Sequence, residues 1–468
     1  MGHAVRPPAR RGWVAIPFVV LALVVIGCQL QLRPTREVPL PPGVDPEQVI
    51  DADNPVESVT PLRPDELAAV GKRIQAEQQK RIRERQAAGA APRRKYNILA
   101  LSGGAVYGAY SAGVLCGWSQ SGLPPEQGGR PEFDVVTGIS TGALIAPFAF
   151  LGPEFDHVLQ TEYTSVRTED IYTRQPVRRI LSESLVDATP FRQRLERRVT
   201  PELVARLAAE HDKGRRLFIG TTNLDTKRIV LWDVGAIAKR GTSEAVQLVR
   251  DVILASASIP GFFPPVRIRV GIDGRSYEEL HVDGSVTRSL FFRPPHFHPG
   301  QDVDPDALAD SNLYVLVAGK INPAPDAVRL RTLPIALNST SLLLYSLTRG
   351  DLYRMYTYCL LTGMNLRVSA IPEQQEVPEK STEFVPAEMC KLFRAGYQMG
   401  QKGDVPGGGE KLDGTAWRDL PPGLKDGEKQ GARTGLNLTV RPKPEGAAGT
   451  RGPEASKGTI VPPTPAVK

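Results

Sequence analysis

Apolar runs of the kind found in buried strands recur through the middle of the chain and fade toward both ends. Between residues 95 and 320 these runs are short, and segments with helical spacing separate them. Continuous apolar runs are typical of strands buried on both faces, and their alternation with helices predicts a mainly parallel sheet with helices on both sides. The pattern therefore predicts an α/β fold. Strands are expected at 96–101, 133–140, 216–226, 228–235, 278–285 and 312–320, and helices at 107–122, 141–152 and 244–258.

Outside the regular middle, the composition changes. Residues 29–63 are rich in Pro, Val and acidic side chains, which suits an extended tether, and a charged helix is expected to begin at Pro64. Regions 155–213 and 333–361 have helical character and would cover the sheet or build a lid. The C-terminal segment is rich in Gly and Pro and cannot bury a core. The predicted organisation is a signal peptide at 1–28, a tether with a charged helix at 29–94, the α/β domain at 95–402 and a flexible tail at 403–468.

The N-terminus has the layout of a secretory signal peptide. Arg6, Arg10 and Arg11 precede an apolar run at 13–28, which is shorter than the roughly 20 residues of a membrane span. The run ends in Val-Ile-Gly-Cys, and this ending resembles the lipobox of bacterial lipoproteins. The resemblance implies that Cys28 is lipidated and anchors the protein to a membrane of the bacterial cell envelope, at the outer membrane or the periplasmic face. An uncleaved signal anchor that ends by chance in cysteine is the alternative.

Charge and cysteine usage narrow the function classes. The formal net charge of +7 suits an anionic surface such as a membrane, and neither an aromatic-and-basic RNA-binding signature nor zinc-finger spacing accompanies it. No CxxC pair is present, so no metal, redox centre or other cofactor is expected. Cys359 and Cys390 could pair in an oxidising compartment, which depends on a distance that the sequence does not give. The cysteines are Cys28, Cys116, Cys359 and Cys390.

A serine between glycines ends the apolar run at 133–140. Gly138 and Gly142 flank Ser140 in a GxSxG pattern, where a strand is expected to turn sharply into a helix. Acyl-transfer enzymes place a nucleophilic hydroxyl on such a turn, and the following helix directs its N-terminal amides toward the reacting carbonyl. An ordinary glycine-containing turn between strand and helix is the alternative.

A glycine loop follows the first strand of the regular region. Gly103, Gly104 and Ala105 lie between the strand at 96–101 and a helix, where bare backbone amides can bind a developing oxyanion or a phosphate. A dinucleotide-binding loop is the competing interpretation, but no acidic residue closes a strand about 20 residues later, as that motif requires. Because the next strand delivers the GxSxG instead, both loops are expected to open at the same edge of the sheet.

An aspartate ends another apolar strand much later in the chain. Asp283 lies in the segment 281–286 and is followed by Gly284. A carboxylate at such a position can take a proton directly from a serine, with a pKa set by burial and by its neighbours. A simple Asp-Gly turn is the alternative.

Taken in order, these motifs resemble the patatin-like phospholipase family. The resemblance implies a three-layer α/β/α hydrolase fold around a mainly parallel sheet, and hydrolysis of acyl esters in lipids or lysolipids of membranes. It spans about half of the chain. The matching segments are 96–101, Gly103-Gly104, the GxSxG at 138–142, 221–233, 255–265 and Asp283-Gly284.

The resemblance also implies roles for single residues. Ser140 would be the nucleophile and Asp283 the general base of a dyad that needs no histidine. The backbone amides of Gly103, Gly104 and Ala105 would form the oxyanion hole. Acylation of the serine would release the alcohol or lysolipid, and water activated by the aspartate would then free the fatty acid.

Three positions depart from the family pattern. Ala105 replaces a third glycine, Tyr107 replaces a basic residue in the loop, and Ser285 follows the Asp-Gly pair where Gly or Ala is usual. The tyrosine leaves open how a phosphate headgroup would be held. Ala105 and Tyr107 also favour the alternative of a catalytically weakened, lipid-binding scaffold lipoprotein on the same fold.

The histidines offer a rival mechanism. Ser140, Asp283 and then His296 or His298 follow the chain order of an α/β-hydrolase triad, although both histidines lie in a proline-bracketed loop. His281 shares a strand face with the aspartate and could tune its carboxylate. A metal site at the His-Phe-His segment lacks further ligands. The apolar segment 339–363 could cap an acyl pocket or simply pack as a helix.

Overall fold

The protein was analysed as a computed structural model, which describes residues 56–58, 95–174, 184–272, 275–293, 308–321 and 332–403. Several predictions from the sequence fall outside these ranges and stay predictions. They concern Cys28 and its apolar run, the charged helix from Pro64, His296 and His298, and the tail beyond residue 403.

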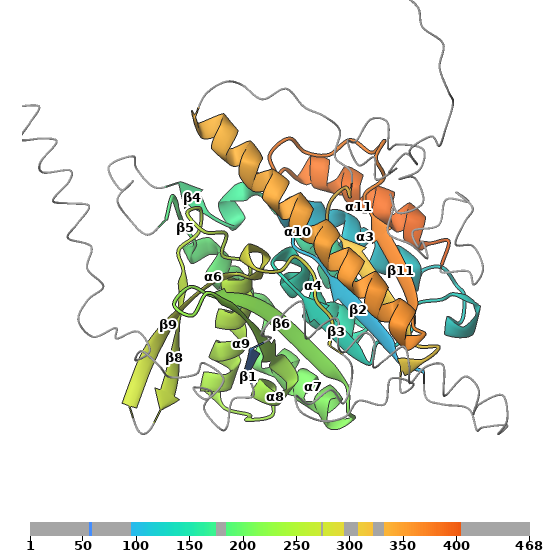
Figure 1. Ribbon diagram of the computed structural model, residues 1–468, viewed down its shortest axis with the longest axis horizontal. Coiled ribbons are helices and arrows are strands. Elements are labelled where there is room, and N and C mark those ends of the chain that lie inside the picture. Colours follow the sequence, from blue (N-terminus) through green and yellow to red (C-terminus); the bar gives the residue numbers. More distant parts are fainter. Residues whose placement is uncertain are drawn as a thin grey trace, which may run out of the picture. The chain divides into compact units, whose positions relative to one another are not determined.

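One mixed sheet organises the described residues (Figure 1). Its middle is parallel, in the spatial order β6-β3-β2-β10-β11, as the alternation of apolar runs and helices predicts. Parallel neighbours need crossover connections, and helices supply them. These five strands are β2 (Asn97–Leu101), β3 (Val135–Gly138), β6 (Arg216–Asn223), β10 (Asn312–Val317) and β11 (Asn365–Ala370).

Antiparallel strands extend the sheet beyond β6. β7 pairs with one edge of β6, and β9 pairs with the far end of its other edge, just beyond β3. β8 pairs with β9, and the two leave the sheet as a long hairpin in Figure 1. β1 lies within the predicted tether 29–94 and pairs with β7, so this segment contributes a strand that its composition did not indicate. The bounds are β1 (Val56–Ser58), β7 (Arg228–Asp233), β8 (Val266–Ile272) and β9 (Arg275–Asp283).

Helices cover both faces of the sheet. The alternation along β2 shows this directly, because Leu99 and Leu101 join one hydrophobic cluster while Ile98 and Ala100 join another. α3, α4, α9 and α11 contribute to the first cluster, and α10 to the second. The helices are α3 (Gly108–Ser119), α4 (Thr141–Leu151), α5 (Asp156–Thr164), α6 (Thr189–Arg198), α7 (Pro201–Asp212), α8 (Val234–Ala238), α9 (Ser243–Ser256), α10 (Thr332–Thr362) and α11 (Pro386–Gly400).

The remaining elements are short. β4 (Thr173–Arg174) and β5 (Val186–Asp187) form a separate two-stranded sheet. The 3-10 turns that matter for the site are η2 (Ala105–Tyr107) after β2 and η7 (Gly284–Val286) after β9. The three-layer α/β/α arrangement implied by the family resemblance is confirmed.

The long helix α10 packs against the sheet, and none of its described residues lines the apolar pocket beside Ser140. Leu352, Met355 and Cys359 bury its inner face in the second cluster, with β10 and β11. Cys359 and Cys390 are both free thiols, so the pairing that the sequence left open is not formed. Among the described residues, none of the helices combines the length and the apolar run that a membrane crossing requires.

Candidate active site

Strand register brings Ser140 and Asp283 to the same level of the sheet. Leu101 of β2 and Ile219 of β6 are the partners of Gly138, so β2 and β3 end in one row while β6 continues past it. Ser140 lies two residues beyond that row. Asp283 pairs with Thr221, which is also two residues beyond it. The convergence of loops at one sheet edge, predicted from the sequence, is therefore what the structure shows.

Ser140 occupies a strained turn. Its φ of 55° and ψ of −124° lie in a region that residues with a side chain rarely adopt, which costs of order 1–3 kcal/mol. The flanking glycines make this turn possible. A Cβ at Gly142 would collide with the Leu101 carbonyl oxygen, and one at Gly138 would come within 2.5 Å of the Gly142 carbonyl oxygen. The carbonyl of Ser140 then accepts the first helical hydrogen bond, from Ala143 N at 2.9 Å.

Ser256 holds this turn from behind, and sequence reasoning gave it no role. Its Oγ accepts the backbone N–H of Ser140 at 3.0 Å and donates to the Gly220 carbonyl at 2.7 Å. The side chain is fully buried at the end of α9. The only signal in the sequence was its place in the segment 255–265, which contributed to the family resemblance.

Asp283 is buried beside the serine. The Ser140 hydroxyl faces its carboxylate closely enough to lower the pKa of Asp283, and Ser285 N–H donates to Oδ1 at 2.8 Å. Burial nevertheless dominates and raises the pKa of Asp283 to about 6, while the hydrogen bonds from Ser140 and Ser285 lower it. The backbone N–H of Asp283 bonds to the Ser258 carbonyl, which fixes the end of β9 against the segment after α9. At neutral pH this carboxylate is charged and can accept a proton.

The glycine loop lies opposite the serine. A Cβ on Gly103 would come within 3.0 Å of the Ser140 Cβ and would collide with the Ser285 hydroxyl, so only glycine fits there. Gly104 has a φ of 156° and Ala105 one of 47°. Within the described part of the chain, the backbone amides of these three residues donate no hydrogen bond to another backbone group. They are therefore available to a ligand.

Side-chain and backbone bonds fix the loop to the sheet. Ser102 N–H donates to Leu316 O at 3.0 Å, and its Oγ accepts Ala318 N–H at 2.8 Å while donating to the next carbonyl, that of Gly103. β10 therefore holds the loop from the side opposite β3. Pre-organised amides of this kind stabilise a developing oxyanion without reorganisation at the moment of reaction.

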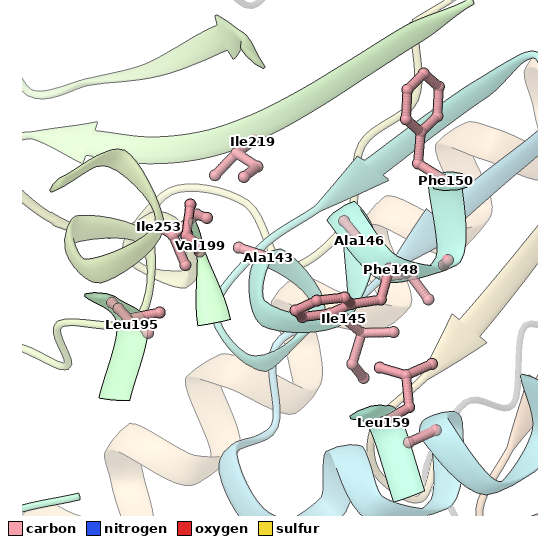
Figure 2. Packing of buried hydrophobic residues seen from close by; sticks show 14 of the residues in the cluster. Ala143, Ile145, Ala146, Phe148, Phe150, Leu159, Leu195, Val199, Ile219 and Ile253 are labelled. Carbon is pink, nitrogen blue, oxygen red and sulfur yellow. The ribbon is translucent and has the colours of Figure 1, made fainter. Parts of the chain in front are cut away.

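A mostly apolar pocket opens beside the serine. It encloses about 980 Å³ of empty space, open mouth included, between α4, α5, α6 and the segment after α9. Figure 2 shows Leu195, Val199 and Ile253 together on one side of Ala143, with Phe148 and Leu159 on the other. Its lining includes Ser140, Ala105, Leu144, Phe191, Ile259 and Phe263. A long hydrocarbon chain is the ligand that such walls suit.

Comparison with known proteins identifies the domain. A family model described as "Patatin-like phospholipase" matches residues 99–295. These residues form a patatin-like phospholipase domain. The match contains the glycine loop, the strained serine, Ser256 and Asp283.

Two other comparisons add no functional information. A search of curated proteins found no match to this chain. The crystal structure of VipD from Legionella pneumophila is similar to it with a TM-score of 0.28 and 11% sequence identity, over 67% of each chain. Because a TM-score of this size does not establish a shared fold, the assignment of the patatin-like domain rests on the family model.

The departures from the patatin-like pattern have local explanations. Ala105 adopts its positive φ at the start of η2, and among the described residues its amide donates no hydrogen bond to another backbone group. Burial raises the pKa of Tyr107 to about 12, so its side chain is neutral. Its hydroxyl donates to Pro378 O at 2.8 Å and not to Ser140. Ser285 binds the Asp283 carboxylate. The loop thus supplies no positive charge at position 107.

His281 has its hydrogen-bonding partners outside the Ser140–Asp283 pair. His281 is fully buried, and its ring contacts Thr221 Oγ1 at 2.9 Å and Glu279 Oε2 at 3.1 Å. The pKa of Asp283 is set by burial, Ser140 and Ser285. His281 is not among these causes, so it does not tune the carboxylate. The proposed triad partners His296 and His298 lie outside the described residues.

Proposed function

We propose that the protein is a serine-dependent lipid acyl hydrolase of the phospholipase A or lysophospholipase type, with Ser140 and Asp283 as a catalytic dyad. The patatin-like domain supports the class of reaction. The observation that carries the residue assignment is the strained Ser140 facing a buried carboxylate whose pKa its hydroxyl lowers and which is ionised at neutral pH. The apolar pocket next to this serine supports a lipid acyl chain as the substrate group.

Acylation follows from this geometry. Asp283 takes the proton of the Ser140 hydroxyl as Oγ forms a bond to the ester carbonyl carbon. The negative charge moves to the carbonyl oxygen, where the amides of Gly103, Gly104 and Ala105 donate hydrogen bonds. When the carbonyl re-forms, the bond to the alcohol oxygen breaks, and the alcohol leaves with the proton held by Asp283.

Deacylation repeats the same sequence with water. Asp283, again ionised, accepts a proton from a water molecule whose oxygen attacks the acyl carbon. The same three amides stabilise the second oxyanion. Breaking the bond to Ser140 Oγ releases the fatty acid, and the proton returns to the serine. A raised carboxyl pKa near the working pH favours both acylation and deacylation, because Asp283 must accept a proton and then return it in each step.

The N-terminal segments belong to this proposal as predictions. A lipidated Cys28, followed by the tether 29–94, would hold the domain 95–402 at a bacterial membrane, with the tail 403–468 free of the core. Such an anchor would bring the pocket to its lipid substrate. Sensitivity of processing to globomycin, together with palmitate labelling that a Cys28→Ala variant lacks, would support the anchor, and labelling that persists in the variant would contradict it.

A scaffold lipoprotein on the same fold is the second candidate. Ala105 and Tyr107 favour it, because both depart from the family pattern at the loop that would bind the oxyanion. A scaffold would not need a reactive serine. The two candidates therefore differ in one property, the nucleophilicity of Ser140.

Labelling by a fluorophosphonate probe separates them. Covalent labelling that Ser140→Ala abolishes, with hydrolysis of a p-nitrophenyl ester reduced roughly 10⁴-fold or more in that variant, would support the hydrolase. Absence of labelling in the folded wild-type protein would favour the scaffold. A His296→Ala, His298→Ala double variant tests the rival triad, and we expect it to retain most of the activity. Loss of activity in that folded variant would overturn the dyad.

A further inference from the structure

Three charged side chains interrupt the apolar wall of the pocket. Glu162 of α5 and Arg194 and Arg198 of α6 line the same cavity as Ser140. Lysine, arginine and glutamate are depleted from buried apolar surfaces, so a charged group of this kind needs an explanation. None of the three takes part in the dyad or in the loop that faces it.

Glu162 holds the two arginines side by side. Its Oε2 accepts Arg194 Nε at 2.5 Å, and its Oε1 accepts Arg198 Nε at 2.5 Å. Each guanidinium therefore binds the carboxylate through Nε. Among the described residues, no other hydrogen bond or ion pair engages the terminal nitrogens of either group. Those nitrogens are the donors that match phosphate and carboxylate oxygens in a fork.

The cluster leaves one positive charge on the pocket wall. Arg194 and Arg198 lie four residues apart on one helix, and like charges at that spacing repel each other. One carboxylate offsets one of the two charges. The side chains of Glu162, Arg194 and Arg198 are 16%, 17% and 38% exposed, so water screens the remaining charge only in part. A mainly apolar pocket with one net positive charge is complementary to an amphiphile with one negative charge.

The helix α5, which carries Glu162, contacts the turn that holds the nucleophile. Tyr163, next to Glu162 in the chain, places its hydroxyl 2.6 Å from Thr141 Oγ1, and Thr141 directly follows Ser140. In a glycerophospholipid the phosphate is only a few bonds from the acyl esters. An anion site for this substrate must therefore share a cavity with the nucleophile, as the cluster does.

We propose that Arg194 and Arg198 bind the phosphate of a glycerophospholipid whose acyl ester is attacked by Ser140. This proposal rests on the proposed hydrolase function and names its substrate class. It also accounts for the loop position occupied by Tyr107, where the family usually has a basic residue, because the positive charge comes from α6 instead. Glu162 positions the two guanidinium groups.

The experiment compares two lipids with identical acyl chains, phosphatidylglycerol and diacylglycerol, in micelles of a nonionic detergent. Arg194→Gln and Arg198→Gln are each expected to lower the ratio of kcat/KM for the phospholipid to that for the neutral lipid by about tenfold, mainly through KM. Arg194→Lys keeps the positive charge but lacks the forked donors of a guanidinium, so its kcat/KM ratio should lie between those of the wild type and Arg194→Gln. Arg197→Gln removes the same charge from an exposed position on the same helix, outside the pocket lining, and should keep the wild-type ratio.

The outcomes are distinguishable. A parallel loss on both lipids would assign the cluster a purely structural role and overturn the phosphate site. An unchanged ratio would overturn it as well, as would a change confined to inhibition by added palmitate, since the arginines would then bind the product carboxylate. Absence of Ser140-dependent hydrolysis of either lipid would remove the proposed function together with this inference, whereas the other results remove the inference alone.

Discussion

Asp283 and His281 lie two residues apart on β9, and both are buried opposite β6, yet their surroundings differ. His281 belongs to a continuous strand. Trp232 Nε1 donates to Thr221 Oγ1 at 2.8 Å, Thr221 contacts His281 Nδ1, and His281 Nε2 contacts Glu279. Each of the four side chains in this chain of contacts therefore has a hydrogen-bonding partner.

Asp283 lies where the strand ends. Its partners are the hydroxyl of a serine with positive φ and the backbone of the following turn, and its pKa is raised toward neutrality by burial. A pocket and a loop of available amides adjoin it. The comparison shows that burial of a polar group does not by itself indicate chemistry. A complete network on regular backbone stabilises the fold, whereas a raised pKa next to strained backbone and open space is typical of an active site.

Among variants that keep the nucleophile, Asp283→Asn is expected to have the largest effect on turnover. The amide keeps the shape of the side chain but cannot take the serine proton, so kcat should fall roughly 10³-fold, within the usual contribution of a general base. Stability should not fall, because the variant removes a buried charge. Ester kinetics and thermal unfolding at pH 8 check both expectations. A folded variant with near-normal kcat would show that another group is the base.

The pH dependence follows from the raised pKa of Asp283. Below a pH of about 6 the carboxyl is protonated, so kcat/KM should fall about tenfold per pH unit on the acid side. The effect of pH on the free energy of unfolding has the opposite sign. The folded state holds this proton more tightly than the unfolded chain does, so the contribution of Asp283 to the free energy of unfolding decreases as pH rises from about 4 to about 6. A profile that stays flat down to pH 5 would contradict the assignment.

Ser256→Ala should have an intermediate effect. The change leaves the buried N–H of Ser140 without its acceptor and releases the strained turn, and we expect kcat to fall about tenfold with little change in KM. Ser258→Ala is a matched control. Ser258 is equally buried two residues further on, but its hydroxyl donates to the Leu254 carbonyl and does not touch Ser140. Equal losses of kcat in both variants would mean that Ser256 merely supports the packing of α9.

His281→Gln should have the smallest effect on turnover. It breaks the buried network beside Trp232, so the free energy of unfolding should drop by about 1–3 kcal/mol, while kcat of the folded protein stays within about twofold of wild type. Urea unfolding and ester kinetics measure the two quantities. Together with Asp283→Asn, this variant separates stability from activity. A large loss of kcat here would place the histidine in the reaction after all.

Much of the fold could be predicted because its signals are local. The apolar runs at 96–101 and 133–140 became β2 and β3, and the glycines of 138–142 permit the turn at Ser140. β8 and β11 were missed. β8 alternates apolar and arginine side chains as half of a hairpin that leaves the sheet, and this pattern is weaker than a buried run.

The site could be predicted only as far as its parts are visible in short motifs. Ser140, Asp283 and the glycine loop each have a local signature. Ser256 does not, because its importance depends on contact with a residue 116 positions away. Arg194 and Arg198 look like part of an ordinary charged helix until packing places Glu162 between them.

By itself, the sequence determined the elements, the strained turn and the class of chemistry, since these depend on side-chain periodicity and on glycines within a few residues. Tertiary structure alone decided which groups meet. The pairing of Thr221 with Asp283 brings the aspartate level with Ser140, while the Thr221 hydroxyl contacts His281, two residues away on the same strand. Burial then sets its pKa near 6. Contacts and dielectric surroundings arise only when distant segments pack together, and "DVVTGIS" contains neither.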